Sequence, residues 1–391
     1  MVDFELTEND RKILDEVRAQ ALVCRNYARY YDENEHEFPP DELPESKDYE
    51  NIYTLFAGRT EKDTNFGVMS MLVASGQTWG DYSVAMHRGK GGGLGNAALS
   101  AAGTPEQIEK WRGLTLAMAI TEPGCGSDPS KVQATAVLDG DEWVINGEKI
   151  FVTTGCRCEG VVVWATLDRS AGRAGIKSFL IEKGTPGFVV AQKEKKLGIR
   201  ADDTATFVFS DCRIPRGNLL GGNEEIPKKS SGGFKKVMKT FNMTRPAVAA
   251  IGIGMAEATL DFTRDQLVQA GFGLTYGGGL HTRPAAVEKF QKLEAVFEAT
   301  QLTILRAAWL SDEGMENNTE ASVCKAKAGE AVRQITQGCI EILGPMGVSR
   351  EHLVEKWFRD VRITDIYEGT GEIQRMITAR ALLGYTRKEL N

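Results

Sequence analysis

The spacing of apolar residues divides the chain into stretches with different periodicity. Residues 8–31 are predicted to form a helix, because their apolar residues recur at helical spacing and Asn9 or Asp10 lies near the start. These apolar residues include Ile13, Val17, Ala21 and Ala28. After a loop rich in proline and acidic residues, residues 50–112 are mostly compatible with helix and are interrupted by the run Gly89–Gly95.

From about residue 117 the pattern changes to short runs of β-branched and aromatic residues separated by turn signals. Asn146-Gly147 lies between two such runs, which predicts a β-hairpin at that point. No helical pattern separates the runs, so they favour an antiparallel sheet or barrel over a Rossmann unit. We therefore expect a central β domain at about 117–228.

Helical periodicity returns after a loop rich in lysine and glycine at residues 228–236. Pro246 is predicted to lie in the first turn of a helix, where a proline is tolerated. Three apolar stripes follow, the last of them closed by Gly344-Pro345. The stripes comprise Val248, Ile251, Met255, Ala258 and Phe262; Phe290, Leu293, Phe297 and Ile304; and Ala328, Val332, Ile335, Cys339 and Ile342. They predict a bundle of long helices joined by short links.

Composition narrows the class of protein. The chain has 391 residues, of which 42% are hydrophobic and 26% charged, as is typical of a globular protein with two or three structural units. A net charge of −7 supplies no field attractive to phosphate, so we expect no nucleic-acid partner. No apolar run approaches the roughly 20 residues that span a bilayer, so we expect no membrane segment. The polar, acidic start MVDFELTEND resembles neither a secretory signal nor a transit peptide.

The cysteines are uninformative as metal ligands. Seven of them are scattered along the chain, which fits a reducing cytoplasm. Cys156-x-Cys158 has the wrong spacing for a zinc knuckle and has no second pair. With only four histidines as well, we expect no metal site.

Two glycine-containing segments are candidates for ligand binding. Gly93-Leu-Gly95-x-x-Ala98 matches the dinucleotide fingerprint in its letters, but no hydrophobic strand precedes it, so a turn between helices is favoured. Thr121-Glu-Pro-Gly-Cys-Gly-Ser-Asp128 can present N–H groups and two hydroxyls to a polar ring edge or a phosphate. A plain Gly/Pro turn explains its glycines and proline but not its hydroxyls, and both interpretations stay open.

A third segment, Tyr367-Glu-Gly-Thr-Gly-Glu-Ile-Gln374, places a carboxylate beside a glycine at a predicted helix boundary. Glu368 can be interpreted as a helix-capping acid and Thr370 as the N-cap residue. On local grounds alone, this structural interpretation is the better one.

Together, these motifs and their order around a β domain make the chain similar to the acyl-CoA dehydrogenase family from about residue 105 onward. The matching segments are Thr121–Asp128, Asn146–Thr153, Phe207–Pro215, Asn218–Gly221, Thr244–Pro246 and Ile366–Arg375. Residues 35–100 match the family poorly. The resemblance implies an α+β, mostly α fold. Its expected parts are an N-terminal helical domain at 1–116, a central antiparallel β-barrel-like domain at 117–228 and a C-terminal four-helix bundle at 229–391.

The resemblance also implies a chemistry: FAD-dependent α,β-dehydrogenation of an acyl-CoA thioester to a trans-2-enoyl-CoA, in fatty acid or lipid catabolism by β-oxidation. Glu368 would remove the α-proton, flavin N5 would accept the β-hydride, and an electron-transfer flavoprotein would take the electrons. The implied FAD contacts are Met118, Ile120, Thr121, Gly126, Ser127, Phe151, Val152, Thr153, Thr370 and Glu372. The implied contacts to the acyl-CoA substrate are Ser127, Asn242, Arg245, Gly369 and Arg380.

The chain departs from the family pattern at four positions. Phe151 replaces the usual Trp but keeps an aromatic face for the flavin. Gln269 stands where an Arg-x-x-Phe-Gly motif has the arginine that reaches the FAD pyrophosphate of a neighbouring subunit. Glu341 and Pro345 replace the first and last residues of a Gln-x-x-Gly-Gly motif that also contacts the neighbour's cofactor. The chain is therefore expected to be the catalytic subunit of a hetero-oligomer whose partner supplies these contacts, or else a homotetramer with a rewired adenosine end.

Two other functions are alternatives. A flavin oxidase or hydroxylase on the same scaffold would react with oxygen, but Ser127, Arg245 and Arg380 match positions that serve a CoA ester in the family. A non-catalytic subunit that completes a partner's flavin site would be expected to lack the base and the first flavin loop. Both Glu368 and Thr121–Ser127 are present.

Overall fold

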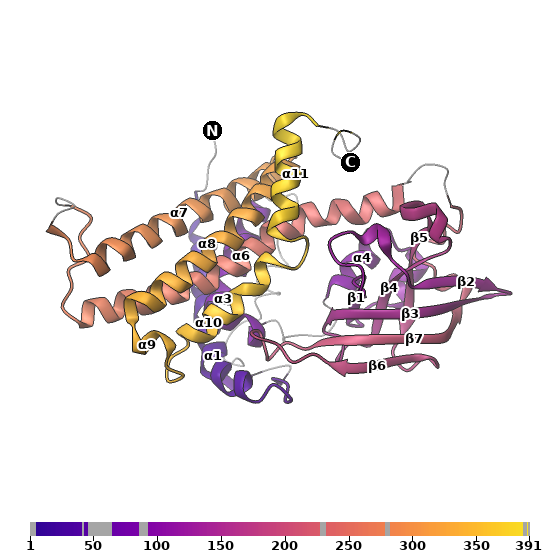
Figure 1. The fold of residues 1–391 in the computed structure, drawn as a ribbon, viewed down its shortest axis with the longest axis horizontal. Helices are drawn as coiled ribbons and strands as arrows, with labels where there is room; N and C mark the ends of the chain where they lie inside the picture. The colour runs from indigo at the N-terminus through magenta and orange to yellow at the C-terminus, as the bar shows by residue number, and fades with distance from the viewer. Residues whose placement is uncertain are drawn as a thin grey trace. The chain divides into compact units, whose positions relative to one another are not determined.

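The structure, a computed structural model, describes residues 5–40, 43–45, 65–85, 93–226, 232–277, 282–385 and 389, without the side chains of 232–243. The structure divides into two compact units (Figure 1). The helical unit comprises the described residues of Met1–His87, Leu197–Ala201 and Asn242–Asn391. The sheet unit comprises those of Arg88–Lys196 and Asp202–Phe241. The expected division into three domains at 116/117 and 228/229 stays a prediction.

In the described N-terminal part of the helical unit, helix α1 (Glu8–Glu33) packs against helix α3 (Phe66–Ala85). Thr7 caps α1 through a reciprocal pair of hydrogen bonds with Asp10, which places the start where the sequence predicts it. The predicted apolar stripe is buried, with Val17 and Ala28 at 0% exposure. The helices approach closely at Gly80, where a Cβ atom would lie 2.0 Å from the Ala21 carbonyl oxygen.

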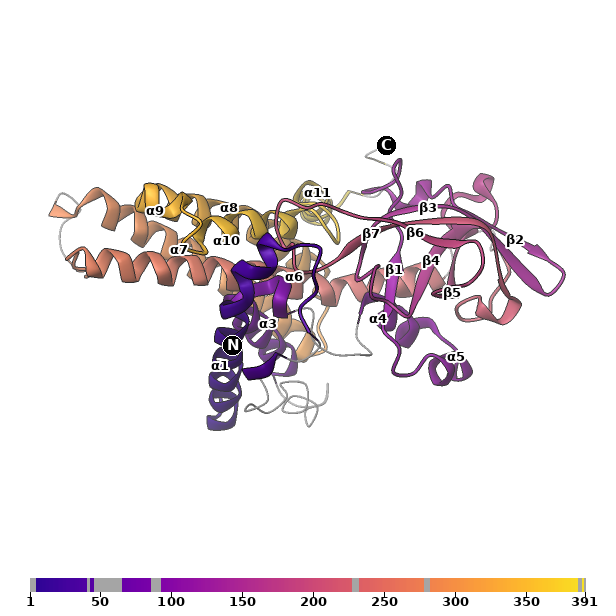
Figure 2. The same cartoon turned by 90° about the horizontal axis from the view of Figure 1, so that it is seen from below.

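The C-terminal part of the helical unit consists mainly of long helices that lie side by side (Figure 2). They are α6 (Gly232–Gln269), of which residues from Asn242 onward belong to this unit, α7 (Ala285–Asp312) and α8 (Asn318–Leu343). The shorter helix α11 (Gly371–Leu383) packs on α8. Shorter elements connect α8 to α11, namely α9 (Pro345–Val348), α10 (Val354–Asp360) and the 3-10 turn η6 (Val361–Asp365). The predicted stripes supply much of the common core, including Phe290, Val332 and Ile335, so the predicted bundle is confirmed.

The prediction for Pro246 is wrong. Helix α6 begins at Gly232, so Pro246 lies in the helix interior and residues 232–236 are helical instead of part of a loop. A proline in this position has no N–H to donate to the preceding turn. Pro246 is itself buried, as are Val248 and Ala249. The first-turn preference of proline therefore does not identify the start of this helix.

A buried ionic cluster joins distant parts of the helical unit. Lys356 on α10 lies between the carboxylates of Asp81 and Asp360, and all three side chains are fully buried. Asp81 interrupts α3 with an extended backbone conformation. The Ile199 N–H donates to Asp360 Oδ1 at 2.6 Å, which ties the short segment Leu197–Ala201 to α10.

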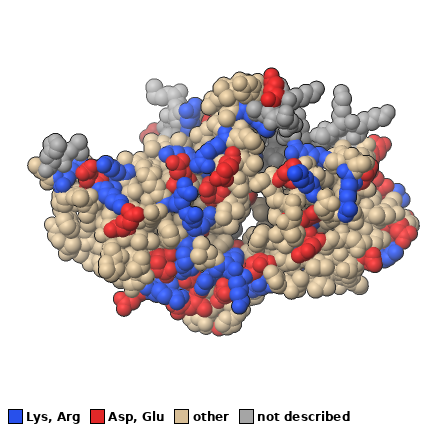
Figure 3. Space-filling view, viewed as in Figure 1, with Lys and Arg blue, Asp and Glu red and all other residues tan. Residues whose placement is uncertain are grey.

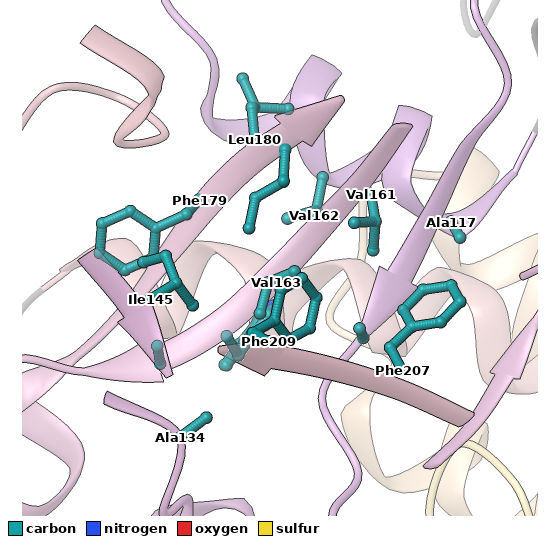
Figure 4. Packing of buried hydrophobic residues seen from close by; sticks show 14 of the residues in the cluster. Ala117, Ala134, Ile145, Val161, Val162, Val163, Phe179, Leu180, Phe207 and Phe209 are labelled. Atoms are coloured by element: carbon teal, nitrogen blue, oxygen red, sulfur yellow. The ribbon is translucent and has the colours of Figure 1, made fainter. Parts of the chain in front are cut away.

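The sheet unit contains one curled sheet of seven strands in the order β1-β4-β2-β3-β7-β6, with β5 paired to β4. The strands are β1 (Leu116–Ala119), β2 (Thr135–Asp139), β3 (Glu142–Thr153), β4 (Gly160–Thr166), β5 (Ile176–Glu182), β6 (Phe188–Lys193) and β7 (Thr204–Pro215). Most pairs are antiparallel, as predicted, but β4 pairs in parallel with β1 and β2. Its core gathers fully buried side chains such as Val162, Phe179 and Phe207 (Figure 4).

The hairpin predicted at Asn146-Gly147 is wrong, because β3 runs unbroken from Glu142 to Thr153. The register of β3 against β7 shifts between Ile145 and Gly147, which marks a bulge. Asn146 accepts a hydrogen bond from the Asp211 N–H at 2.7 Å, and Gly147 has φ 144°. A Cβ atom at Gly147 would lie 2.6 Å from the Ala134 Cβ. Asn146-Gly147 therefore forms a bulge within β3. The hairpin between β2 and β3 turns at Gly140-Asp141 instead.

Short helices α4 (Leu94–Ala102) and α5 (Pro105–Lys110) belong to the sheet unit and precede β1. Gly93 is the N-cap of α4, and a Cβ atom at Gly95 would lie 2.3 Å from the Ala117 carbonyl oxygen. The described element before this glycine run is helix α3, whereas a dinucleotide fingerprint follows a strand. The other glycines of the run, at 89, 91 and 92, lie outside the described residues.

The described residues of the sheet unit also form the 3-10 turns η2 (Pro129–Lys131), η3 (Arg169–Gly175) and η4 (Arg216–Asn218). No helix among the described residues is both long enough and apolar enough to cross a membrane. On the face drawn in Figure 3, the described acidic and basic side chains are intermixed.

Candidate functional site

In the helical unit, the candidate site is the turn between η6 and α11. Its centre is Glu368, which has φ 54°, followed by Gly369 with φ 93°. A positive φ at a non-glycine residue costs about 1–3 kcal/mol and persists only where its surroundings hold it. Gln374 donates from Nε2 to the carbonyl oxygens of Glu368 at 3.3 Å and Gly369 at 3.2 Å. Lys325 Nζ donates to the same Gly369 oxygen at 2.8 Å.

Thr370 begins α11 as its N-cap residue. Its hydroxyl accepts a hydrogen bond from the Ile373 N–H at 3.4 Å, as the local interpretation predicts. The other half of that interpretation is wrong, because the cap of α11 is Thr370 and not the Glu368 carboxylate. Glu372 lies exposed in the first turn of α11, where its own backbone N–H and the Thr370 hydroxyl lower its pKa.

The Glu368 carboxylate is held in a mixed environment. Its Oε2 atom is buried, and no group among the described residues donates a hydrogen bond to it. Burial raises the pKa of Glu368, while a hydrogen bond from Thr244 and the charges of Lys325 and Arg245 oppose that rise. The result is a carboxylate with one unsatisfied oxygen and increased basicity, which is suited to accepting a proton.

The other predicted substrate residues of this unit lie on helices α6 and α11 and, for Gly369, in the turn itself. Arg245 on α6 is 8% exposed, and its Nη1 lies 3.4 Å from the Ser322 hydroxyl. Arg380 lies in the last turn of α11 with a buried Nε atom. Gly369 lies directly after Glu368, and a Cβ atom there would lie 2.4 Å from Gln374 Nε2. The side chain of Asn242 lies outside the described part of the chain.

In the sheet unit, the candidate loop Thr121–Asp128 follows β1. Glu122 and Cys125 exchange two backbone hydrogen bonds of 3.0 Å, which close a tight turn around Pro123-Gly124. Thr121 is partly exposed, and its carbonyl oxygen accepts from the Ile150 N–H at 2.9 Å. Gly126 and Ser127 are exposed after the turn. Met118 and Ile120 pack at the edge of the sheet core.

A buried ion pair anchors this loop to β3. Glu122 Oε1 accepts from Lys149 Nζ at 2.7 Å, and Lys149 also donates to the Ile120 carbonyl oxygen at 3.0 Å. The remaining lone pairs of Glu122 accept from the N–H groups of Gln133 at 2.6 Å and Ala134 at 2.9 Å. Because Lys149 lies on β3, and Gln133 and Ala134 directly precede β2, these bonds give the loop a defined path.

The predicted aromatic contact lies on β3. The register against β7 shifts between Lys149 and Val152, and Phe151 within this irregularity has φ 56°. Its side chain is 63% exposed, which is unusual for a phenylalanine and leaves the ring available for stacking. Val152 is 1% exposed in the core, so only its backbone can meet a ligand, and Thr153 is partly exposed.

Apart from Phe151, the positions that depart from the family pattern lie on the helical unit. Gln269 ends α6 and is exposed together with Phe272 and Gly273. Glu341 on α8 forms an ion pair with Lys289 of α7, and Gln337 donates to it at 3.0 Å. These partners hold the pKa of Glu341 below its usual range. The carboxylate at this position is thus ion-paired within the chain.

Sequence reasoning missed four side chains that shape the two candidate segments: Lys325, Gln374, Glu122 and Lys149. Lys325 had one usable signal, since it is a lone cation among small residues on the buried face of a predicted helix. Glu122 and Lys149 had none, because their pairing joins a loop to a strand 27 residues later.

The comparisons with known proteins agree on one family. The model of the acyl-CoA dehydrogenase middle domain matches residues 117–212, and that of the acyl-CoA dehydrogenase C-terminal domain matches residues 231–383. The rat mitochondrial short-chain specific acyl-CoA dehydrogenase is 39% identical over 272 residues, which are 68% of this chain but only 62% of that protein.

The bovine protein of the same name is 35% identical over 350 residues and is matched over 82% of its length, by 84% of this chain. Among solved structures, butyryl-CoA dehydrogenase from Megasphaera elsdenii has a TM-score of 0.79 and 29% identity, with 98% of this chain and 100% of that chain covered. Two family models in the expected order, a bovine relative aligned over most of both chains and a shared fold point the same way. The chain belongs to the acyl-CoA dehydrogenase family.

Proposed function

We propose that this chain catalyses the FAD-dependent α,β-dehydrogenation of an acyl-CoA thioester, with Glu368 as the base that removes the α-proton. The observation that carries the proposal is the state of Glu368: it lies on a strained turn, its Oε2 atom is buried without a hydrogen-bond donor among the described residues, and burial raises its pKa. Family membership supports the same reaction class.

The α-proton of a thioester is too weakly acidic for an ordinary exposed carboxylate. Desolvation makes Glu368 a stronger base, with a pKa nearer working pH. Its own backbone N–H is proposed to donate to the thioester oxygen and to stabilise the charge that develops as the proton leaves. Gly369 leaves room beside this position, where any side chain would first meet Gln374.

FAD is assigned to the residues of the sheet unit together with Thr370 and Glu372 of α11. The exposed Phe151 ring suits stacking on a flat aromatic ligand, and the anchored loop from Thr121 to Ser127 offers hydroxyl and backbone groups to a polar ring edge. When bound, FAD would supply acceptance of the β-hydride. Met118, Ile120, Gly126, Val152 and Thr153 complete the proposed set.

The coenzyme A portion of the substrate is assigned to Ser127, Asn242, Arg245 and Arg380. Arginine side chains suit the anionic and polar groups of such a ligand. An electron-transfer flavoprotein is the proposed electron acceptor, and β-oxidation of fatty acids or related lipids is the proposed setting.

The proposed assembly is a tetramer in which a related chain supplies the far-end FAD contacts. Two observations support a hetero-oligomer: Gln269 carries no charge for a pyrophosphate, and Glu341 presents a carboxylate already paired with Lys289.

The Glu368→Gln variant tests the proposed base. The amide keeps the size of the side chain but cannot take a proton, so turnover is expected to fall by about 10²–10⁴-fold while FAD stays bound. The measurement is anaerobic bleaching of the flavin by a panel of acyl-CoA esters, with the flavin spectrum as the control for cofactor content. Turnover retained by this variant would remove Glu368 from the proposed role.

A further inference from the structure

Lys325 on α8 is a fully buried lysine in a helix face of small residues, with Ala321, Cys324 and Ala328 also buried around it. Burial of an ammonium group is unfavourable unless it is paired and hydrogen-bonded. Desolvation lowers the pKa of Lys325 to about 8, and nearby carboxylates limit the fall. A lysine kept in such a place points to a role for its amine.

The amine of Lys325 lies against the Glu368 turn. It donates to the Gly369 carbonyl oxygen at 2.8 Å, over a separation of 44 residues in the chain. The charges that act on it come from three directions: Asp365 of η6, Glu368 and Glu372 next to and within α11, and the cation Arg245 of α6. The acidic groups are in the majority, so the ammonium form suits this position.

Two glycines show how directly the turn packs on its neighbours. A Cβ atom at Gly329, one turn after Lys325 on α8, would lie 2.2 Å from Asp365 Oδ1. A Cβ atom at Gly371 would lie 2.3 Å from the same oxygen. Asp365, before Glu368, therefore packs closely on both α8 and the start of α11, and Lys325 bonds a carbonyl oxygen of the turn between Asp365 and α11.

We propose that Lys325 is a positioning residue for Glu368: it holds the strained turn through the Gly369 carbonyl oxygen and places a buried cation beside the catalytic carboxylate. This inference rests on the proposed function of Glu368. Gln374 shares the first task, because it bonds the same carbonyl, but it carries no charge. Within the described part of the chain, only Lys325 combines the hydrogen bond to the turn with a charge that favours ionised Glu368.

The charge of Lys325 predicts the direction in which the pH profile of kcat/KM shifts when this lysine is replaced. Lys325 lowers the pKa of Glu368 against the effect of burial. Without this cation the carboxylate ionises at higher pH, so the acid limb of kcat/KM moves upward in pH. Arg245 and Thr244 remain in the Lys325 variants and preserve part of the stabilisation of the ionised form.

The test compares Lys325→Met and Lys325→Arg with Lys327→Met in the holoenzyme. Lys327 is a partly exposed lysine on the same helix and serves as the matched control. For Lys325→Met we expect kcat to fall about ten-fold, and the ratio of kcat/KM at high pH to that at low pH to rise roughly three- to ten-fold. Lys325→Arg keeps the charge and is expected to restore the native profile at least in part. Lys327→Met is expected to match the native enzyme.

Thermal unfolding and bound FAD are measured on every variant. A purely structural role would lower the melting temperature or the flavin content without moving the pH profile, and that result would overturn the inference. If Lys325→Met fails to fold, the pH profile of kcat/KM is measured on Lys325→Gln instead. A shift of its acid limb to higher pH would support the inference, and a profile like that of the native enzyme would overturn it. Turnover retained by Glu368→Gln would instead overturn the proposed function, so the two failures are distinguishable.

Discussion

At the scale of single residues, Glu368 combines two unfavourable features that an ordinary surface glutamate avoids. Its backbone has φ 54°, and its Oε2 atom is buried. Burial favours the neutral carboxyl in the folded protein, so Glu368 contributes stability below its unfolded pKa and that contribution is lost as pH rises through the folded pKa. The same shift that weakens the fold at neutral pH strengthens the base.

The pH dependence of the native enzyme follows from this sign. Only ionised Glu368 can accept a proton, and its pKa is raised, so kcat/KM is expected to decline on the acid side at a higher pH than an exposed glutamate would give. Steady-state kinetics across a pH series would measure this decline, with an acyl-CoA substrate whose acyl group does not ionise. A profile that stays level down to the ordinary glutamate pKa of about 4.3 would contradict the shift.

At the scale of elements, the buried pair Glu122–Lys149 connects the loop after β1 to strand β3. Glu122 also receives two backbone N–H groups, so the pair fixes where the proposed flavin loop begins. Breaking one partner of a buried pair leaves an uncompensated charge, which costs about 3–5 kcal/mol.

The variant Lys149→Met is therefore expected to lower the free energy of unfolding by about 3–5 kcal/mol and to weaken FAD binding. Urea unfolding followed by tryptophan fluorescence measures the first, since Trp143 and Trp164 lie in the sheet core. Lys131→Met, at an exposed lysine of the same region, is the control. Equal stability of the two variants would show that the pair anchors nothing.

At the scale of the whole molecule, the departures at Gln269 and Glu341 concern assembly. Neither change affects the buried core, because both residues are exposed. The native chain expressed alone is expected to retain FAD incompletely, whereas co-expression with a chain that carries the missing arginine and glutamine should restore it.

The double variant Gln269→Arg, Glu341→Gln should then raise the FAD retained by the chain alone after gel filtration. It supplies a cation for the pyrophosphate and removes a carboxylate, and the ion pair with Lys289 that it breaks lies on the surface, where such pairs stabilise little. Gln266→Arg, one turn earlier on α6, is the control. A native chain that forms a fully flavinated homotetramer by itself would contradict the hetero-oligomer.

Prediction from sequence succeeded where the governing interactions are periodic or local. The stripe of α1, the stripes of α7 and α8, and the cap at Thr370 were all predicted, because each depends on neighbours within a few residues. Prediction failed where residues distant in the sequence override a local conformational preference. Asn146-Gly147 favours a hairpin in isolation, but Asp211 and Ala134 convert it to a bulge.

The sequence by itself determined which regions of this protein are helical and which form strands, its family and the candidate base at Glu368. These depend on residue types and their order. Only the tertiary structure decided how that base is held. How the Glu368 carboxylate, with its buried Oε2 atom, is held depends on α6 and α8, which bring Thr244, Arg245 and Lys325 to it from more than 40 residues away. Desolvation and charge act through space, so a residue's own neighbours in the chain do not determine them.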